Sequence, residues 1–282
     1  MAHYTSSPRP EDARLLHGTG RIEFLRTQEL VRRHLDPGRP RRVLDVGGAS
    51  GVHAEWLAAD GHHVHLVDPV PLHVEQAAER SRASSTPFTT SVGDARALDA
   101  ADGSVDVVLL LGPLYHLVER EDRVGSLSEA RRVLRPGGVV LAAGISRFSS
   151  LLDGVAQSWL DDPDFAAIVE RDLATGVHRN PTGRDEWFTD AYFHRPDELA
   201  AEARDAGLEV DAVLPIEGAG HWAVRRASGR SGTLDDGDVR RVVAAARAAE
   251  GEAALLGASP HLLLVARRPA PGPVTLPVSS DA

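Results

Sequence analysis

A glycine-rich turn and two acidic residues carry the clearest chemical pattern in the sequence. Asp45 lies in an apolar run typical of a buried strand, and this run passes directly into the turn Gly47-Gly48-Ala49-Ser50-Gly51. Glycines let a backbone turn sharply and approach a ligand, and a helix after such a turn offers unpaired N–H groups. Asp68 ends the next predicted strand, where a carboxylate can accept hydrogen bonds from both hydroxyls of a ribose. The combination predicts a nucleoside-binding site.

The spacing of the glycines indicates which kind of nucleoside the turn binds. A dinucleotide-binding enzyme would show G-x-G-x-x-G, whose glycines accommodate a pyrophosphate. Here the pattern is D-x-G-x-A-x-G, beginning at Asp45, which disfavours an NAD-dependent oxidoreductase. Two further motifs follow in order, Val92-Gly93-Asp94-Ala95 after the third predicted strand and Leu-Arg-Pro-Gly-Gly at 134–138 before the fifth. We interpret the Pro-Gly-Gly only as a turn.

With these motifs in order, residues 42–145 resemble the class I S-adenosylmethionine-dependent methyltransferases. The resemblance implies S-adenosyl-L-methionine as cofactor and S-adenosyl-L-homocysteine as product. It implies that Asp45 and the glycines shape the turn under the methionine, that Asp68 holds the ribose and that Asp94 faces the adenine amino group. Family members often carry Gly where Ala49 stands, which makes the turn slightly tighter here. The cofactor-binding residues implied are Asp45, Gly47, Gly48, Gly51, Asp68, Pro69, Gly93, Asp94, Ala95, Leu111 and Gly112.

Further segments resemble a subgroup of bacterial methyltransferases that act on small molecules. They are Gly-Pro-Leu-Tyr-His-Leu at 112–117, Ile-Ser-Arg-Phe at 145–148, Leu-Leu-Asp-Gly at 151–154, His-Arg-Asn-Pro at 178–181 and Phe-Thr-Asp-Ala-Tyr-Phe-His at 188–194. Some members methylate natural products, including carbon 3 of the indole in tryptophan-containing cyclic dipeptides. The resemblance implies a small natural-product-like acceptor, for example the indole carbon or nitrogen of such a dipeptide. The alternatives are an O- or N-methyltransferase of another small metabolite, a non-catalytic S-adenosylmethionine-binding module and, least favoured, the oxidoreductase.

Candidate catalytic residues follow the fourth predicted strand and recur between residues 190 and 217. His116 is a candidate base, because the ordinary imidazole pKa of about 6.5 suits proton transfer, although the side chain could equally pack the loop. Tyr115 fits a pocket wall better than a catalyst, and Glu217 or Asp190 could accept an indole N–H. The catalytic candidates are Tyr115, His116, Asp190, Tyr192, His194 and Glu217; Arg147, His178 and Asn180 accompany them, and Trp222 and Tyr4 are candidate pocket covers.

The run His62-His63-x-His65 is the one pattern that suggests a metal site. His63 and His65 alternate along a predicted strand while His62 belongs to the preceding turn, and no carboxylate or thiol pattern completes a ligand set. We therefore expect no metal site there.

Alternation of strands and helices predicts the architecture that must position these residues. The class is α/β, a Rossmann-like, doubly wound, seven-stranded and mostly parallel sheet, in which ligands bind outside the carboxyl ends of the strands. The predicted strands are 42–46, 64–68, 88–92, 104–111, 139–145, 208–216 and 261–267, and the predicted helices are 10–35, 52–60, 69–82, 120–134, 196–206 and 238–254.

The same alternation predicts how the chain is divided. Residues 1–37 form an N-terminal helical cap and residues 38–268 the methyltransferase-like domain. Within that domain, residues 146–195 are rich in aromatic and polar side chains without strand alternation, which predicts a lid over a pocket rather than another unit of the sheet. Residues 269–282 hold four prolines and are predicted to be a disordered tail.

Composition excludes several other functions. The 282 residues include 31 Lys+Arg against 41 Asp+Glu, a net charge of −10 that argues against a nucleic-acid partner. There is no cysteine, and all the basic residues are arginine, so thiol chemistry and Schiff-base chemistry are impossible. No apolar run approaches the roughly 20 residues that span a bilayer, and the N-terminus does not resemble a secretory signal. We expect a cytoplasmic bacterial enzyme without a membrane partner, whose oligomeric state the sequence leaves open.

Overall fold

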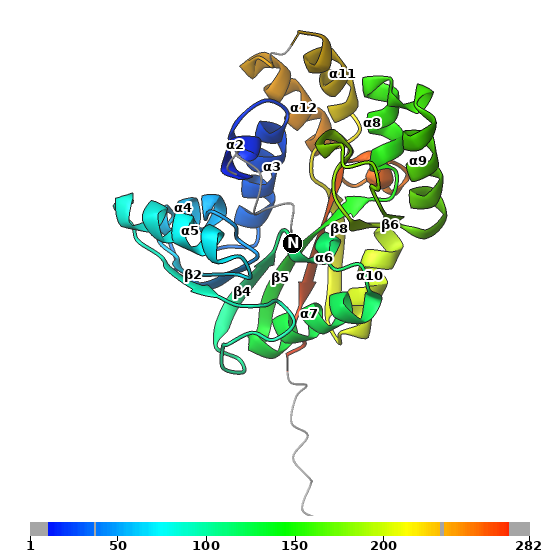
Figure 1. Cartoon of the computed structure of the whole chain (residues 1–282). Helices are drawn as coiled ribbons and strands as arrows, with labels where there is room; N and C mark the ends of the chain where they lie inside the picture. Colours follow the sequence, from blue (N-terminus) through cyan, green and yellow to red (C-terminus); the bar gives the residue numbers. More distant parts are fainter. Residues whose placement is uncertain (1–10, 37, 232–233, 271–282) are drawn as a thin grey trace, which may run out of the picture.

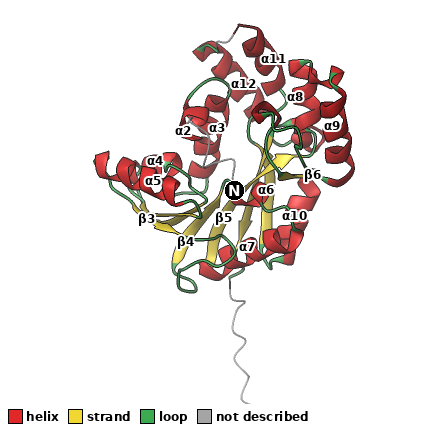
Figure 2. Ribbon diagram, in the orientation of Figure 1, coloured by secondary structure: helices red, strands yellow, loops and turns green. Residues whose placement is uncertain are grey.

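A nine-stranded sheet forms the centre of the fold (Figures 1 and 2). The structure is a computed structural model and describes residues 11–36, 38–231 and 234–270. Five strands run parallel in the order β3-β2-β1-β4-β5, β9 pairs antiparallel with β5, and β8 pairs antiparallel with β9. These strands are β1 Arg42–Val46, β2 His63–Asp68, β3 Thr89–Val92, β4 Val105–Leu110, β5 Leu134–Ser146, β8 Glu209–Pro215 and β9 His261–Arg267.

Helices cover both faces of this sheet because its central strands are apolar on both sides. In β4, Val108 and Leu110 face a core that helices α7 and α10 complete, whereas Val107 and Leu109 face a second core under α3, α4 and α5. Strands that are buried on both faces are typical of a parallel sheet between two helical layers. The predicted Rossmann-like α/β class is therefore confirmed.

The remaining elements surround the carboxyl end of the parallel strands. In Figure 1 the short helix α6 lies near the middle of the view, with α2 and α3, α11 and α12, and α8 and α9 around it. The helices are α2 Glu11–Leu16, α3 Gly20–Arg32, α4 Val52–Ala59, α5 Pro71–Ala83, α6 Pro113–His116, α7 Arg120–Val133, α8 Ser149–Gln157, α9 Pro163–Thr175, α10 Pro196–Asp205, α11 His221–Ser231 and α12 Asp236–Ala249, with 3-10 turns at Trp159–Asp161, Asp185–Trp187 and Ala253–Ala258.

One prediction about the helices was wrong, and four helices were not predicted. The single helix expected over 10–35 is interrupted between α2 and α3, because Gly18 adopts a φ of +53°, which no right-handed helix continues. The helices that were not predicted from the sequence are α6, α8, α9 and α11. Helix α11 is rich in arginine and packs against α8 and α12, which support its helical state.

The segment 146–195 also differs from its prediction, because its last part joins the sheet. β7 Ala191–His194 pairs parallel with β5 at Ile145 and Ser146, and β6 Val177–His178 pairs antiparallel with β7. β4 pairs with β5 only as far as Ala142. The end of β5 is thus left with an unpaired edge, which β7 covers. These two short strands raise the predicted seven strands to nine.

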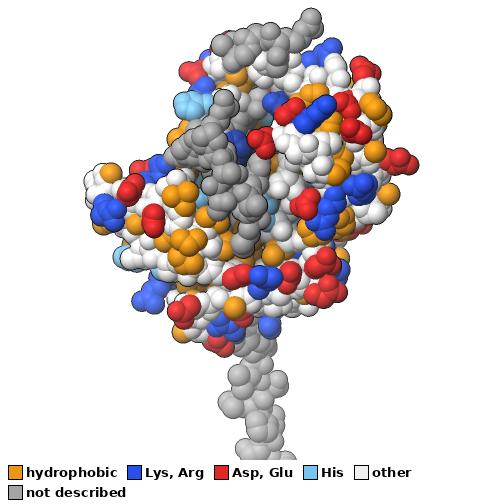
Figure 3. Space-filling view, in the orientation of Figure 1, with side chains coloured by type: hydrophobic (Ala, Val, Ile, Leu, Met, Phe, Trp, Pro, Cys, Tyr) orange, Lys and Arg blue, Asp and Glu red, His pale blue; other side chains and the backbone are white. Residues whose placement is uncertain are grey.

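The surface carries charges of both signs. In the view of Figure 3, acidic and basic side chains lie interspersed over the visible face. Among the helices of the described ranges, none combines the length and the apolar character that a membrane crossing would need. The predicted tail at 269–282 lies almost wholly outside the described residues.

Candidate cofactor and acceptor site

The glycine-rich turn connects β1 to α4 at the carboxyl edge of the sheet. Its backbone is left-handed at three positions, with φ values of +69° at Gly47, +46° at Ala49 and +86° at Gly51. The N–H of Gly47 donates to the carbonyl of Val67 on β2 at 2.7 Å, which fixes where the turn begins. Glycine is favoured at such positions because other residues meet a steric penalty there.

Close contacts explain why two of these glycines cannot carry a side chain. A Cβ built on Gly47 would lie 2.7 Å from the ring of Pro113, the first residue of α6. A Cβ on Gly48 would lie 2.7 Å from the Oδ2 atom of Asp45. The turn therefore packs directly against Asp45 beneath it and against α6 beside it.

Asp68 braces the turn from the end of β2. Its Oδ2 accepts from the N–H of Ala49 at 3.0 Å, and its Oδ1 accepts from the N–H of Val70 at 2.9 Å. The imidazole Nδ1 of His73 lies 3.1 Å from the same Oδ1. A carboxylate offers about four acceptor positions, so Oδ2 retains room for one further donor. Asp68 thus positions the turn, and the predicted contact with a ribose remains a prediction.

Asp45 is a buried carboxylate without a hydrogen bond. Its side chain is 1% exposed, and neither oxygen accepts a hydrogen bond within the described ranges. Burial and the nearby charge of Asp68 raise the pKa of Asp45 to about 7. An orphaned acid is costly to bury, which indicates that a cationic or donor group of a ligand completes this position.

The other predicted cofactor residues lie along the same edge. The carboxylate of Asp94 accepts from the backbone N–H and the guanidinium of Arg96 at 2.8 Å and 2.7 Å. Hydrogen bonding from Arg96 lowers the pKa of Asp94, which therefore remains ionised. Pro69 is exposed next to Asp68, Gly93 follows β3, Ala95 is buried, and Leu111 and Gly112 connect β4 to α6.

Tyr115 and His116 lie on α6, next to the turn. A Cβ built on Gly112 would lie 3.4 Å from the carbonyl oxygen of Gly47 and 3.7 Å from the Tyr115 hydroxyl. The rings of Tyr115 and His116 make an edge contact with centroids 4.7 Å apart. Phe188 stacks on His116 at 6.1 Å and has a φ of +67°, a strained conformation for a bulky residue. The structure therefore brings an aromatic wall to the glycine turn.

Tyr192 and His194, two predicted catalytic residues, belong instead to a buried network behind that wall. His194 is fully buried, and its Nε2 lies 3.3 Å from Glu202 on α10. Glu202 forms an ion pair with Arg123 at 2.7 Å, and the Arg123 guanidinium lies 3.5 Å above the ring of Tyr192. These contacts join β7 to α7 and α10, so the network holds the fold of this region together.

The structure places the remaining candidates of the lid segment in supporting positions. Asp190 is exposed and forms an ion pair with Arg179, so it does not lie with the other candidates. His178 lies between Asp172 and the carbonyl of Trp187, each at 2.8 Å. Arg147 and Asn180 also hydrogen-bond to the backbone. Arg147 donates to the carbonyl of Phe193, and Asn180 donates to the carbonyl of Phe188.

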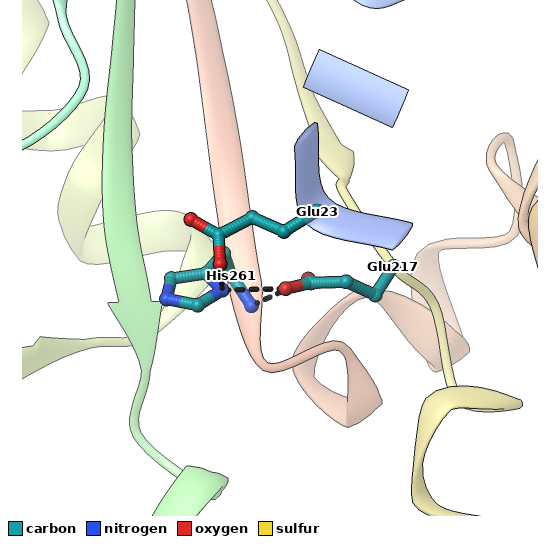
Figure 4. Close-up of side chains that lie close together, drawn as sticks. All are labelled: Glu23, Glu217 and His261. Atoms are coloured by element: carbon teal, nitrogen blue, oxygen red, sulfur yellow. Dashed lines mark hydrogen bonds and ion pairs between the residues drawn. The ribbon is translucent and has the colours of Figure 1, made fainter. Parts of the chain in front are cut away.

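Glu217 lies in a charged cluster that was not foreseen from the sequence. Its Oε1 is 2.6 Å from the Nδ1 of His261, and its Oε2 accepts from the backbone N–H of His261 at 3.1 Å. Glu23 of α3 approaches the same nitrogen, with its Oε2 4.0 Å from Nδ1 (Figure 4). Glu23 and His261 stand far apart in the sequence, so no local motif could have revealed the cluster.

The charges of this cluster reinforce one another. Although burial opposes the shift, the charges of Glu217 and Glu23 raise the pKa of His261 to about 9. Burial likewise opposes the effect at Glu23, where the charges of Arg14 and His261 lower the pKa to about 2. At neutral pH the imidazole is therefore a cation whose Nδ1 faces two carboxylates.

His62, His63 and His65, the histidines considered above as a metal site, make separate contacts. His62 accepts from the N–H of Arg41, and the two ring nitrogens of His65 contact Thr89 and Ser91. His63 is exposed at the start of β2.

Trp222 and Tyr4 were the candidate pocket covers. The indole N–H of Trp222 donates to the carbonyl of Ala258 at 2.6 Å, and Tyr4 lies outside the described residues.

The fold and the braced turn define a Rossmann-like protein with a ligand site at the carboxyl edge of its sheet. A family model described as "Methyltransferase domain" matches residues 43–138. The ubiquinone/menaquinone biosynthesis C-methyltransferase UbiE of Acidiphilium cryptum is 34% identical over 180 residues, which are 62% of this chain and 69% of that protein. A ubiquinone biosynthesis O-methyltransferase of Methylobacterium nodulans is 27% identical over 227 residues, 77% of this chain and 83% of that protein.

Solved structures agree on the fold. An S-adenosylmethionine-dependent methyltransferase of Methanosarcina mazei superposes with a TM-score of 0.58 at 18% identity and covers 86% of this chain and 98% of its own. The [4+2]-cyclase SpnF reaches 0.54 at 21% identity, over 88% of this chain and 81% of its own, so the fold by itself does not fix the reaction. The chain belongs to the class I S-adenosylmethionine-dependent methyltransferases, which confirms the resemblance seen in the sequence.

The cofactor of this family fits the residues that are present. S-adenosylmethionine brings an ammonium group and a ribose with two hydroxyls. The orphaned carboxylate of Asp45 and the spare acceptor position on Asp68 match such donors. Gly47 and Gly48 let the turn pack closely against Asp45 and α6, which fixes its backbone at this edge of the sheet. When bound, the cofactor supplies a methyl group on a sulfonium, which a nucleophile can accept.

Adding a methyl group at Gly47 provides a direct test of the turn. We expect Gly47→Ala to weaken binding of S-adenosylhomocysteine at least about tenfold, because its Cβ must displace Pro113 and α6. Isothermal titration calorimetry measures the affinity. Gly61→Ala is the matched control: Gly61 has a similar φ of +92° but no neighbour within 4 Å, so this variant should bind normally. Equal affinities for the two variants would contradict the prediction.

Proposed function

We propose that this methyltransferase acts on a small aromatic acceptor of the natural-product type, bound between α6 and the end of β5. The observation that carries the proposal is the aromatic wall of Tyr115, His116 and Phe188 beside the glycine turn. Strained residues persist where their surroundings hold them, and they cluster at ligand sites. Phe188 is such a residue, and its ring stacks on His116 rather than filling the main core.

In this proposal the wall orients the acceptor and His116 takes its proton. Holding two reactants in line contributes up to about 7–11 kcal/mol to a transfer reaction, so positioning supplies much of the rate. A positioned base adds about a hundredfold or more when the accepting atom must lose a proton. Tyr115 meets the imidazole edge-on and Phe188 stacks on it, so both rings supply apolar surface next to the base.

The names of the relatives bear on which atom of the acceptor is methylated. Their names assign them C- and O-methyl transfer in the biosynthesis of ubiquinone or menaquinone. The indole of a tryptophan-containing cyclic dipeptide, which the sequence resemblance implies, is an aromatic acceptor. The accepting atom distinguishes C-methylation from O- or N-methylation.

A panel of acceptors tests the proposal. Purified protein would be incubated with S-adenosylmethionine and either catechol-type phenols or indole-bearing cyclic dipeptides, and S-adenosylhomocysteine would be quantified. We expect turnover with at least one aromatic acceptor and a loss of about a hundredfold in kcat for His116→Gln, with cofactor affinity unchanged.

A matched surface variant controls this experiment. Leu72 is an exposed apolar residue of α5, so Leu72→Ala should retain full activity while Phe188→Ala raises KM for the acceptor. Turnover confined to aliphatic acceptors, or Phe188→Ala and His116→Gln variants as active as the parent, would refute the proposal.

A further inference from the structure

The charged cluster of Glu23, Glu217 and His261 lies at the same carboxyl edge of the sheet. His261 begins β9 and lies directly opposite Ile145 near the end of β5. Residues opposite one another in an antiparallel pair project to the same face of a sheet. Ile145 packs with Tyr115 and Phe188, so His261 lies on the same face of the sheet as the residue that contacts the aromatic wall.

One hydrogen bond orients the His261 imidazole, and three further hydrogen bonds hold its partner Glu217 and the adjoining loop in place. Its Nδ1 lies 2.6 Å from the Oε1 of Glu217, whose Oε2 accepts from the backbone N–H of His261 at 3.1 Å. Ser259 donates to the same Oε2 at 3.3 Å and accepts from the N–H of Gly218 at 3.0 Å. Because Glu217 is only 1% exposed, its carboxylate is a fixed partner that orients the imidazole.

The second ring nitrogen of His261 remains available. Nε2 makes no hydrogen bond within the described ranges, and the side chain is 18% accessible. Figure 4 shows this nitrogen on the side of the ring that points away from Glu217. A cationic imidazole in this position presents an N–H donor to whatever occupies the edge of the sheet.

Glu23 connects this centre to the cofactor turn. Its carboxylate accepts two hydrogen bonds from Arg14 of α2, at 2.6 Å and 3.1 Å. Its charge also reaches His53, in the first turn of α4 directly after the glycine turn. Burial lowers the pKa of His53 to about 4, against the effect of Glu23, so His53 is neutral. On the α11 side, burial lowers the pKa of His221.

We propose that Glu217 and His261 form the part of the acceptor site that binds an ionisable hydroxyl, with His261 donating from Nε2 to the oxygen of a phenol or enol. This inference rests on the proposed function and narrows its acceptor class. Charge-assisted hydrogen bonds of this kind are about twice as strong as neutral ones and favour the anion over the neutral hydroxyl. Glu217 is then a positioning residue, since it acts through His261.

The chemical step balances with this assignment. The hydroxyl gives its proton to His116, the base of the proposed function, as the acceptor binds. The acceptor oxygen, or the ring carbon conjugated with it, forms a bond to the methyl carbon while the carbon–sulfur bond breaks. After transfer to carbon, that carbon loses its hydrogen to solvent as a proton, which restores the aromatic ring. The negative charge of the acceptor and the positive charge of the sulfonium cancel, so no further reactant is required.

The probe for this site is 4-nitrophenol, whose phenolate is coloured, with 4-nitroanisole as an analogue that has no ionisable hydroxyl. Both would be titrated into the full-length protein saturated with S-adenosylhomocysteine, and the visible spectrum would report the ionisation of the bound probe. We expect 4-nitrophenol to bind as the phenolate, with its apparent pKa lowered by at least about one unit, and 4-nitroanisole to bind at least about tenfold more weakly.

Three variants make the test specific. His261→Gln keeps a donor without the charge, and we expect it to lose the pKa shift of the probe. Glu217→Gln should have the same effect by returning His261 toward its ordinary pKa, and thermal unfolding would verify that both variants are folded. His63→Gln, at the exposed amino end of β2, is the matched control and should behave like the parent.

The outcomes separate this inference from the proposed function. If S-adenosylhomocysteine fails to bind the parent protein, the proposed function fails. If it binds but the probe's ionisation is the same in the parent and in His261→Gln, only the acceptor assignment fails. Probe binding that requires a divalent cation and disappears with EDTA would also overturn it, because Glu23, Glu217 and His261 would then be metal ligands.

Discussion

Replacing Asp45 by asparagine is expected to stabilise the ligand-free protein at pH 8 while weakening its binding of S-adenosylhomocysteine. The pKa of Asp45 is about 7 in the folded protein, because burial and Asp68 raise it from an ordinary value of 3.8. Each pKa unit corresponds to about 1.4 kcal/mol, so the ionised side chain costs up to about 4 kcal/mol of folding free energy. The amide of an asparagine side chain is neutral at every pH, so the Asp45→Asn protein would avoid this cost.

The sign of the pH dependence follows from proton binding. Between about pH 4 and pH 7 the folded protein holds a proton on Asp45 that the unfolded chain has lost. Raising the pH through this range therefore lowers the stability of the parent protein, and Asp45→Asn should remove this part of the pH dependence. Urea unfolding at pH 5 and pH 8 measures the effect as a difference between the two proteins.

Ligand binding should change in the opposite direction. The ionised carboxylate is the form that pairs with an ammonium group, so we expect Asp45→Asn to reduce affinity for S-adenosylhomocysteine at least about tenfold in calorimetry. Asp99→Asn, on an exposed loop, is the control and should alter neither property, with stability within about 0.5 kcal/mol. A destabilised Asp45→Asn protein with unchanged affinity would show that the carboxylate serves the fold and not the ligand.

The second large effect is expected from Glu202 of α10. Its ion pair with Arg123 is almost completely buried, with side chains 3% and 2% exposed, and His194 completes the network. Removing one partner leaves an uncompensated buried charge, which costs about 3–5 kcal/mol. Glu202→Gln should therefore lower the free energy of unfolding by about this amount, as measured by urea denaturation with circular dichroism.

An exposed glutamate provides the control that distinguishes the effect of removing a buried charge from that of removing any carboxylate. Glu170 is exposed on α9, so Glu170→Gln should change the stability by less than about 0.5 kcal/mol. If Glu202→Gln also costs less than about 1 kcal/mol, Arg123 does not depend on Glu202. The hydrogen bonds from Arg123 to the carbonyls of Leu117 and Val118 would then be sufficient to hold the guanidinium.

Local features of the sequence were sufficient to predict the main strands of the sheet and the glycine turn. Strands β1, β2, β4 and β9 were predicted within a residue or so of their bounds, because buried strands are short apolar runs separated by Gly and Pro. The glycine turn was predicted for a related reason. The backbone is left-handed at Gly47 and Gly51, and other atoms approach it closely at Gly48. Such positions favour glycine, so the turn can be recognised from residue types alone.

Only the tertiary structure decided which side chains meet at the edge of that frame. His194 has the residue type of a catalyst, yet β7 inserts beside β5 and buries it against Glu202, whereas Asp190 remains exposed. Glu23, Glu217 and His261 come together because α3, the end of β8 and the start of β9 converge there. Local sequence fixes backbone conformation and burial, but strand order and helix docking depend on packing across the whole chain, and those interactions leave no local pattern.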